Sequence, residues 1–238
     1  MSEATTVVAP PVAEPKKKSP GLLNQRQAQA LTKAEMTGIA AQHPDHAPAL
    51  DGRDISADFV TQYLGDVDAA REKAADALNS TTARINATAD EKKAAYGLIA
   101  GLREVQKAAK QRYARTNRIA LKDYFVGKSL NGSRPNLMQT SQTILNKAGA
   151  DVLPGITPAK VKALRTSRQA WVDANTAQAE SKATALTQRA ELKDALKSIE
   201  DRRVAIQLAV DAEWPHTNEE NAGVRGQFSL SAKRPLIA

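Results

Sequence analysis

Several kinds of residue are absent or scarce in this chain of 238 residues. It contains no cysteine, which excludes disulfides, thiolate metal ligands and a cysteine nucleophile. Its three histidines leave few groups for metal binding or acid–base chemistry. No apolar run approaches the roughly 18 residues of a membrane span, and no basic-then-apolar signal opens the chain. We therefore expect a cytoplasmic protein without a membrane span.

Large aliphatic side chains are also few, and alanine takes their place. Leu, Ile, Val and Phe together number 46, a fraction that borders on disorder in a chain of net charge +8. Alanine alone contributes 44 residues, and Ala, Glu, Lys, Leu and Arg together make 110. This mixture is typical of long helices whose shared seam is lined by small side chains. The composition predicts an all-α protein, an elongated antiparallel bundle of long alanine-rich helices.

Proline, glycine and capping residues divide the chain into segments. Residues 1–20 hold four prolines and the Lys16–Lys18 run, which predict a disordered arm. Ser56 can cap a helix N terminus, and Thr88 with Glu91 has the spacing of a capping box. We expect a bundle over residues 21–214, with helices at about 22–42, 56–86, 89–126, 135–148 and 158–214, followed by an extended tail over 215–238.

Two expectations concern how these helices are arranged. The short connection at the capping box predicts that 56–86 and 89–126 form an antiparallel hairpin, with Gly127 ending the second helix. The 158–214 segment is either one helix or a hairpin near Asn175, and the absence of Gly and Pro favours one helix. Its expected seam has the heptad-like spacing of a coiled coil and comprises Val161, Leu164, Trp171, Asn175, Ala179, Ala183, Leu186, Leu196, Ile199, Ile206 and Val210.

The sequence offers little for catalysis. The triplet 127–129 (GKS) resembles the end of a phosphate-binding loop, but it follows a helix and lacks the earlier glycine. Glu213 and His216 have a di-iron spacing that Pro215 interrupts. His43 and His46, in a loop that also contains aspartates, come nearest to a metal site. We expect no enzyme, no cofactor and no metal site.

Positive charge is concentrated in one stretch. Residues 107–172 carry 13 Lys and Arg but only Asp123 and Asp151, a net charge of +11. Cations before Asp123 are expected on a helix face opposite Tyr113 and Tyr124, which fit the buried stripe. If the two helices that carry these cations meet at one end of the molecule, the predicted polyanion-binding residues are Lys107, Lys110, Arg115, Arg118, Lys122, Lys160, Lys162, Arg165 and Arg168.

These patterns leave two functions open. Weakly apolar long helices gain stability from partners, which favours a non-enzymatic structural or assembly protein that binds another protein or itself. The alternative is sequence-nonspecific binding of nucleic acid or another polyanion through residues 107–172. The same cations also fit a merely solvated helix face, because Lys and Arg are good helix formers.

Overall fold

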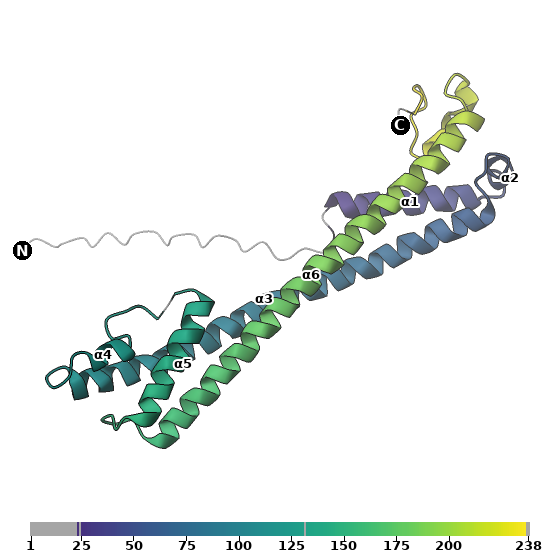
Figure 1. Cartoon of the computed structure of the whole chain (residues 1–238). Coiled ribbons are helices and arrows are strands. Elements are labelled where there is room, and N and C mark those ends of the chain that lie inside the picture. The colour runs from purple at the N-terminus through teal and green to yellow at the C-terminus, as the bar shows by residue number, and fades with distance from the viewer. Residues whose placement is uncertain (1–22, 24, 131, 237–238) are drawn as a thin grey trace, which may run out of the picture.

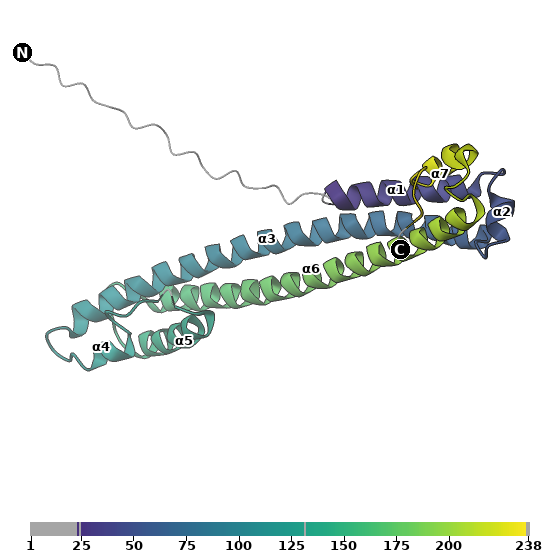
Figure 2. The same ribbon diagram turned by 90° about the horizontal axis from the view of Figure 1, so that it is seen from above.

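The computed structural model describes residues 23, 25–130 and 132–236, and across them the protein is all-α. Two long helices, α3 (Ala57–Tyr113) and α6 (Pro158–Glu213), run antiparallel and pack against each other (Figure 1). Each is about 85 Å long at 1.5 Å per residue. The shorter elements lie towards the two ends of this pair (Figure 2): α1 (Gln25–Gln42), α2 (Ala47–Asp51), α4 (Ala120–Asp123), α5 (Arg134–Ala150), η1 (Glu219–Asn221) and α7 (Ala222–Gln227). The expected all-α, elongated fold is confirmed.

Helices α1, α5 and α6 lie close to the predicted ranges, and α2 forms inside a connection expected to be irregular. The predicted arm over residues 1–20 lies outside the described residues. Within the described part, no helix combines the length and the hydrophobicity needed to cross a lipid bilayer.

The predicted break at Thr88 is wrong, because α3 continues through it as one helix. The Thr88 hydroxyl donates to the carbonyl of Arg84 in the preceding turn (2.8 Å) and caps nothing. Glu91 is 6% exposed and accepts hydrogen bonds from side chains on α5 and α6. The predicted hairpin between 56–86 and 89–126 is therefore absent, and the partner of α3 is α6.

The end of α3 also differs from the prediction, since the helix stops at Tyr113. The chain then turns into α4, and Gln106 on α3 donates to the carbonyls of Tyr124 and Phe125 (3.0 and 2.9 Å), which holds the returning loop against α3. Phe125 and Gly127 have φ angles of 52° and 84°. Gly127 therefore serves the turn after α4 and does not end the long helix.

Helix α6 is uninterrupted, which removes the alternative of a hairpin near Asn175. Buried positions on α6 recur at intervals of seven, at Trp171, Ala185, Leu192, Ile199 and Ile206, with a half-buried residue at 178. The predicted seam is correct near both ends of α6 but wrong in the middle, where 179, 183 and 186 are exposed. From 171 to 183 the predicted seam advances by three steps of four residues. Each step turns about 40° past a full helical turn, so position 183 faces about 120° away from the buried side.

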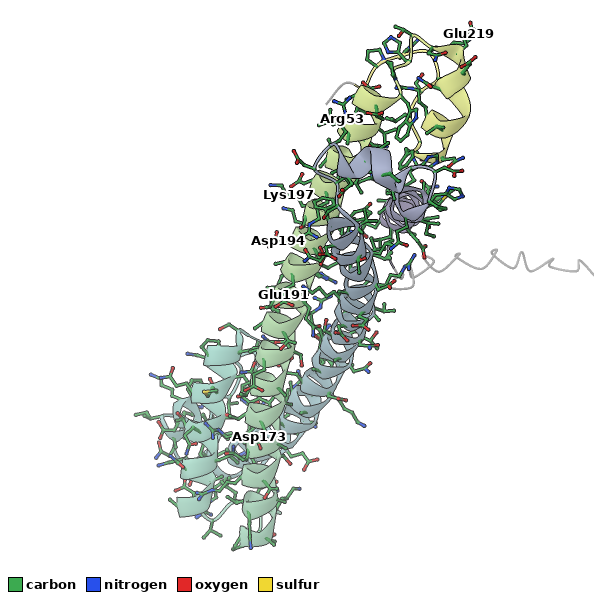
Figure 3. The ribbon with its side chains drawn as sticks, turned by 90° about the vertical axis from the view of Figure 1, so that its right-hand side faces the viewer. Arg53, Asp173, Glu191, Asp194, Lys197 and Glu219 are labelled. Atoms are coloured by element: carbon green, nitrogen blue, oxygen red, sulfur yellow. The ribbon has the colours of Figure 1, made fainter. Side chains whose placement is uncertain are left out.

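The apolar core is divided into two clusters, one at each end of the α3–α6 pair. One joins α1, the start of α3, the end of α6 and the segment after α7. The other joins the end of α3, α5 and the start of α6, and includes Tyr124 and Trp171. Exposed charged side chains follow α6 between the ends, including Asp173, Glu191, Asp194 and Lys197 (Figure 3). Most buried residues of the seam in the middle are small or polar, namely Ala77, Ser80, Thr81 and Ala185, and they are joined by Leu192.

The C-terminal segment is not the predicted extended tail, because it folds into η1 and α7 around a buried arginine. Arg225 is fully buried and forms an ion pair with Asp211 on α6 (2.6 Å). Its guanidinium also donates to the carbonyls of Trp214, Ser231 and Arg234 at 2.7, 2.8 and 3.0 Å. This one side chain satisfies three backbone acceptors of a segment with little apolar content, which explains why the segment is compact.

Candidate functional site

The structure places all nine predicted polyanion-binding residues at one end of the molecule. The last turns of α3, the helices α4 and α5, and the first turns of α6 meet there (Figures 1 and 2). We call this part, residues 103–170, the basic end. An ion pair between Lys160 on α6 and Glu104 on α3 (2.6 Å) shows that the two long helices meet there. The condition that the sequence left open, that both groups of cations share an end, is met.

The predicted stripe on a single helix face is nevertheless wrong. Lys107 and Lys110 belong to α3, but Arg115 and Arg118 lie in the turn after it and Lys122 lies in α4. All five side chains are exposed. The cations are therefore distributed over the end of α3, the following turn and α4 instead of lining one side of a helix.

The nine residues differ in how far their side chains are already occupied. Lys160 pairs with Glu104, and the hydrogen bond between them holds the pKa of Glu104 below its ordinary value. Arg168 donates to the Ser141 hydroxyl (3.2 Å) and so ties α6 to α5, while Arg118 donates to a backbone carbonyl. In the described part of the chain, the remaining six are exposed and lie more than 4.0 Å from any carboxylate oxygen: Lys107, Lys110, Arg115, Lys122, Lys162 and Arg165.

The few acidic residues of the basic end are engaged by other groups. Asp151 accepts hydrogen bonds from the hydroxyls of Tyr113 and Tyr124 (2.9 and 2.7 Å). Burial raises the pKa of Asp151, but these hydrogen bonds and the charge of Lys147 outweigh it, so the pKa lies below its ordinary value. Lys147 also approaches Asp123 (3.7 Å). Among the residues that the structure describes, the six exposed cations therefore form no ion pair.

An ion pair between a buried carboxylate and a partly exposed arginine fixes α5 against both long helices. The Glu91 carboxylate on α3 accepts two hydrogen bonds from Arg134 at the start of α5 (3.2 and 3.1 Å). The indole N–H of Trp171 on α6, itself fully buried, donates to the same carboxylate (3.2 Å). Glu91 therefore joins three helices at the boundary of the basic end, a role that sequence reasoning missed because it assigned Glu91 to a cap.

A hollow of about 450 Å³ opens beside the first turns of α6. Its walls include the apolar side chains of Val152, Ile156 and Val161, and its cations are Lys162 and Arg165. No signal in the sequence indicates this hollow, because its walls come from the end of α5, the following turn and α6.

The other candidates have structural roles or no partners for chemistry. His46 is buried, its Nε2 lies 3.0 Å from Gln227 Oε1, and its ring packs near Trp214 and Phe228. His43 is exposed and lies near Asp45. Across residues 23, 25–130 and 132–236, no three His, Cys, Asp or Glu side chains are grouped to hold a metal ion.

Comparison with protein-family models, with curated proteins and with solved structures finds no match for this chain.

Proposed function

We propose that this chain is a non-enzymatic structural or assembly protein, in which two long helices hold two separately packed ends apart. The division of the apolar core into two clusters supports this proposal. The thin seam between the clusters buries little, so the α3–α6 pair serves mainly to separate the ends. Met36 and Ile39, one turn apart on α1, are 55% and 58% exposed and offer an apolar contact to a protein partner or a second copy.

Light scattering after size exclusion, over a series of protein concentrations, tests self-association. We expect an average mass that rises above the 25.5 kDa of one chain as the concentration increases. Exchanging Met36 and Ile39 for serine should lower that mass, whereas the same exchange at Leu186, exposed in the middle of α6, is the matched control. A mass of one chain at every concentration contradicts self-association.

A second function, sequence-nonspecific binding of a polyanion, is favoured by the six exposed cations of the basic end that form no ion pair with any described residue. Contacts of this kind need no base readout, and their strength falls steeply with salt. Reversing the charge at Arg115, Arg118 and Lys122 should leave the fold intact, because all three side chains are exposed. Each phosphate contact that is lost lowers the slope of log K against log salt by about 0.9 on duplex DNA.

The control for this experiment changes the net charge by the same amount elsewhere. Lys182, Lys193 and Lys197 are exposed on α6 outside the basic end, and their reversal should change the slope much less. Wild-type protein without salt-dependent binding to any polyanion contradicts this second function and leaves the cations as a solvated surface.

A further inference from the structure

The two most exposed large aliphatic side chains among the described residues both lie at the basic end. Ile119 is 76% exposed in the turn between α3 and α4, and Val152 is 87% exposed in the turn between α5 and α6. Both turns lie at the same end of the molecule (Figures 1 and 2). Covering these two side chains by an apolar partner would be favourable, because it removes their surface from water.

Cations accompany both of these side chains. Ile119 is preceded in sequence by Arg115 and Arg118 and is followed by Lys122 in α4, and all three cations are exposed. Val152 borders the hollow that also contains Lys162 and Arg165, which are exposed as well. Each aliphatic side chain therefore has cations near it in the sequence or beside the same hollow. The segment from Arg115 to Lys122 contains no acidic residue.

We propose that the basic end binds the surface of an anionic lipid bilayer, with Ile119 and Val152 entering the interface and the neighbouring cations contacting lipid phosphates. This inference rests on the polyanion-binding function proposed above and names the partner. A bilayer surface accepts both kinds of group, because the apolar side chains enter its acyl boundary while Lys and Arg remain at the headgroups. A nucleic-acid backbone matches the cations but leaves the aliphatic side chains in water.

The partner fits the architecture, since a bilayer contacted at one tip leaves the far end of the molecule away from the membrane. Arg53 and Glu219 mark that far end (Figure 3). Insertion of two turns also requires no membrane-spanning helix. Each cation near an anionic surface contributes about fivefold to binding, and each inserted methylene about fourfold.

Sedimentation with lipid vesicles tests the proposal on the full chain. We expect binding to phosphatidylcholine vesicles that contain about 30% phosphatidylserine and little binding to pure phosphatidylcholine. Ile119→Ser and Val152→Ser should each weaken the binding about tenfold or more without changing the net charge. Leu186→Ser, at an exposed aliphatic position in the middle of α6 that belongs to neither proposed binding surface, is the matched control and should bind like the wild type.

Lys16–Lys18 also adds positive charge to the chain, so binding to anionic vesicles alone does not locate the contact at the basic end. The decisive comparison is therefore between variants that have the same net charge as the wild type. Full binding by Ile119→Ser and Val152→Ser overturns the proposed insertion. Salt-dependent binding to duplex DNA without binding to the anionic vesicles overturns the lipid partner but leaves the polyanion-binding function standing. Absence of binding to both probes overturns the inference and the function on which it rests. Circular dichroism of each variant confirms that the helices are retained.

Discussion

Removing the two partners of the Glu91–Arg134 ion pair in turn should cause unequal losses of stability. The Glu91 side chain is 7% exposed, whereas that of Arg134 is 46% exposed. Without the arginine, the indole N–H of Trp171 is the one side-chain donor left to the buried carboxylate among the described residues. Without the carboxylate charge, the arginine can turn towards water. The structure therefore predicts that loss of Arg134 is the more costly change.

The magnitudes follow from this asymmetry. Stranding a buried carboxylate costs about 3–5 kcal/mol, and the exposure of Arg134 reduces this to about 2–4 kcal/mol for Arg134→Ala. Glu91→Gln keeps an acceptor for Trp171 and loses the charge-assisted hydrogen bonds, at a cost of about 1–2 kcal/mol. Adding Glu91→Gln to Arg134→Ala should restore part of the stability, because the double variant buries no unpaired charge.

Tryptophan fluorescence can follow this end of the molecule alone. The two tryptophans are Trp171 in one apolar cluster and Trp214 packed against the other. In a Trp214→Phe background, urea unfolding monitored by fluorescence reports the free energy of unfolding around Trp171. The reasoning is refuted if Arg134→Ala is no more destabilising than Glu91→Gln, or if the double variant is less stable than Arg134→Ala.

Three further predictions concern α3 and α6. Gly97→Ala should raise the melting temperature, because a Cβ there has open space and alanine is favoured by about 1 kcal/mol in a helix, whereas Gly101→Ala should lower it, because its Cβ would lie 2.2 Å from a buried leucine of α6. Ala185→Leu should cost about 1–3 kcal/mol in urea unfolding by overpacking the seam, and Ala183→Leu, at an exposed position, should be nearly neutral. Burial raises the pKa of Glu91, but its hydrogen bonds with Arg134 and Trp171 outweigh burial, so the pKa in the folded protein lies below the ordinary value of 4.5. The ionised carboxylate therefore stabilises the fold above pH 4.5, and this stabilisation is lost as the pH falls. The difference in unfolding free energy between wild type and Glu91→Gln should shrink between pH 7 and pH 3.

Local signals in the sequence predicted much of the fold correctly. The Ser56 hydroxyl oxygen accepts from the N–H of Phe59 (3.2 Å), so the residue expected to cap this helix does cap α3. Thr157 caps α6 in the same way, by accepting from the N–H of Lys160 (3.2 Å). The absence of Gly and Pro correctly favoured one helix for α6. These features depend on residues within one turn of each other, which is why a single sequence reveals them.

The candidate site was only partly predictable. The excess of cations is local in the sequence, so the basic end could be named before the structure was known. Which cations are free depends on the register of α3 against α6, which places Lys160 beside Glu104. The exposure of Ile119 and Val152 depends on where helices end and how the turns lie, and hydrophobicity alone suggested nothing about it.

The error at Thr88 has a physical origin in the seam. On α3, buried or half-buried positions recur every seven residues from 63 to 105, but 84 and 91 in this series are Arg and Glu. An apolar pattern therefore stops near Arg84 and resumes at Leu98, and a Thr and a Glu with capping spacing fall in the gap. A true boundary would also shift the heptad phase or introduce a Gly or Pro, and α3 shows neither between Gly65 and Gly97. The unbroken seven-residue spacing, with polar residues at seam positions, indicates a continuous helix with a polar stretch of seam.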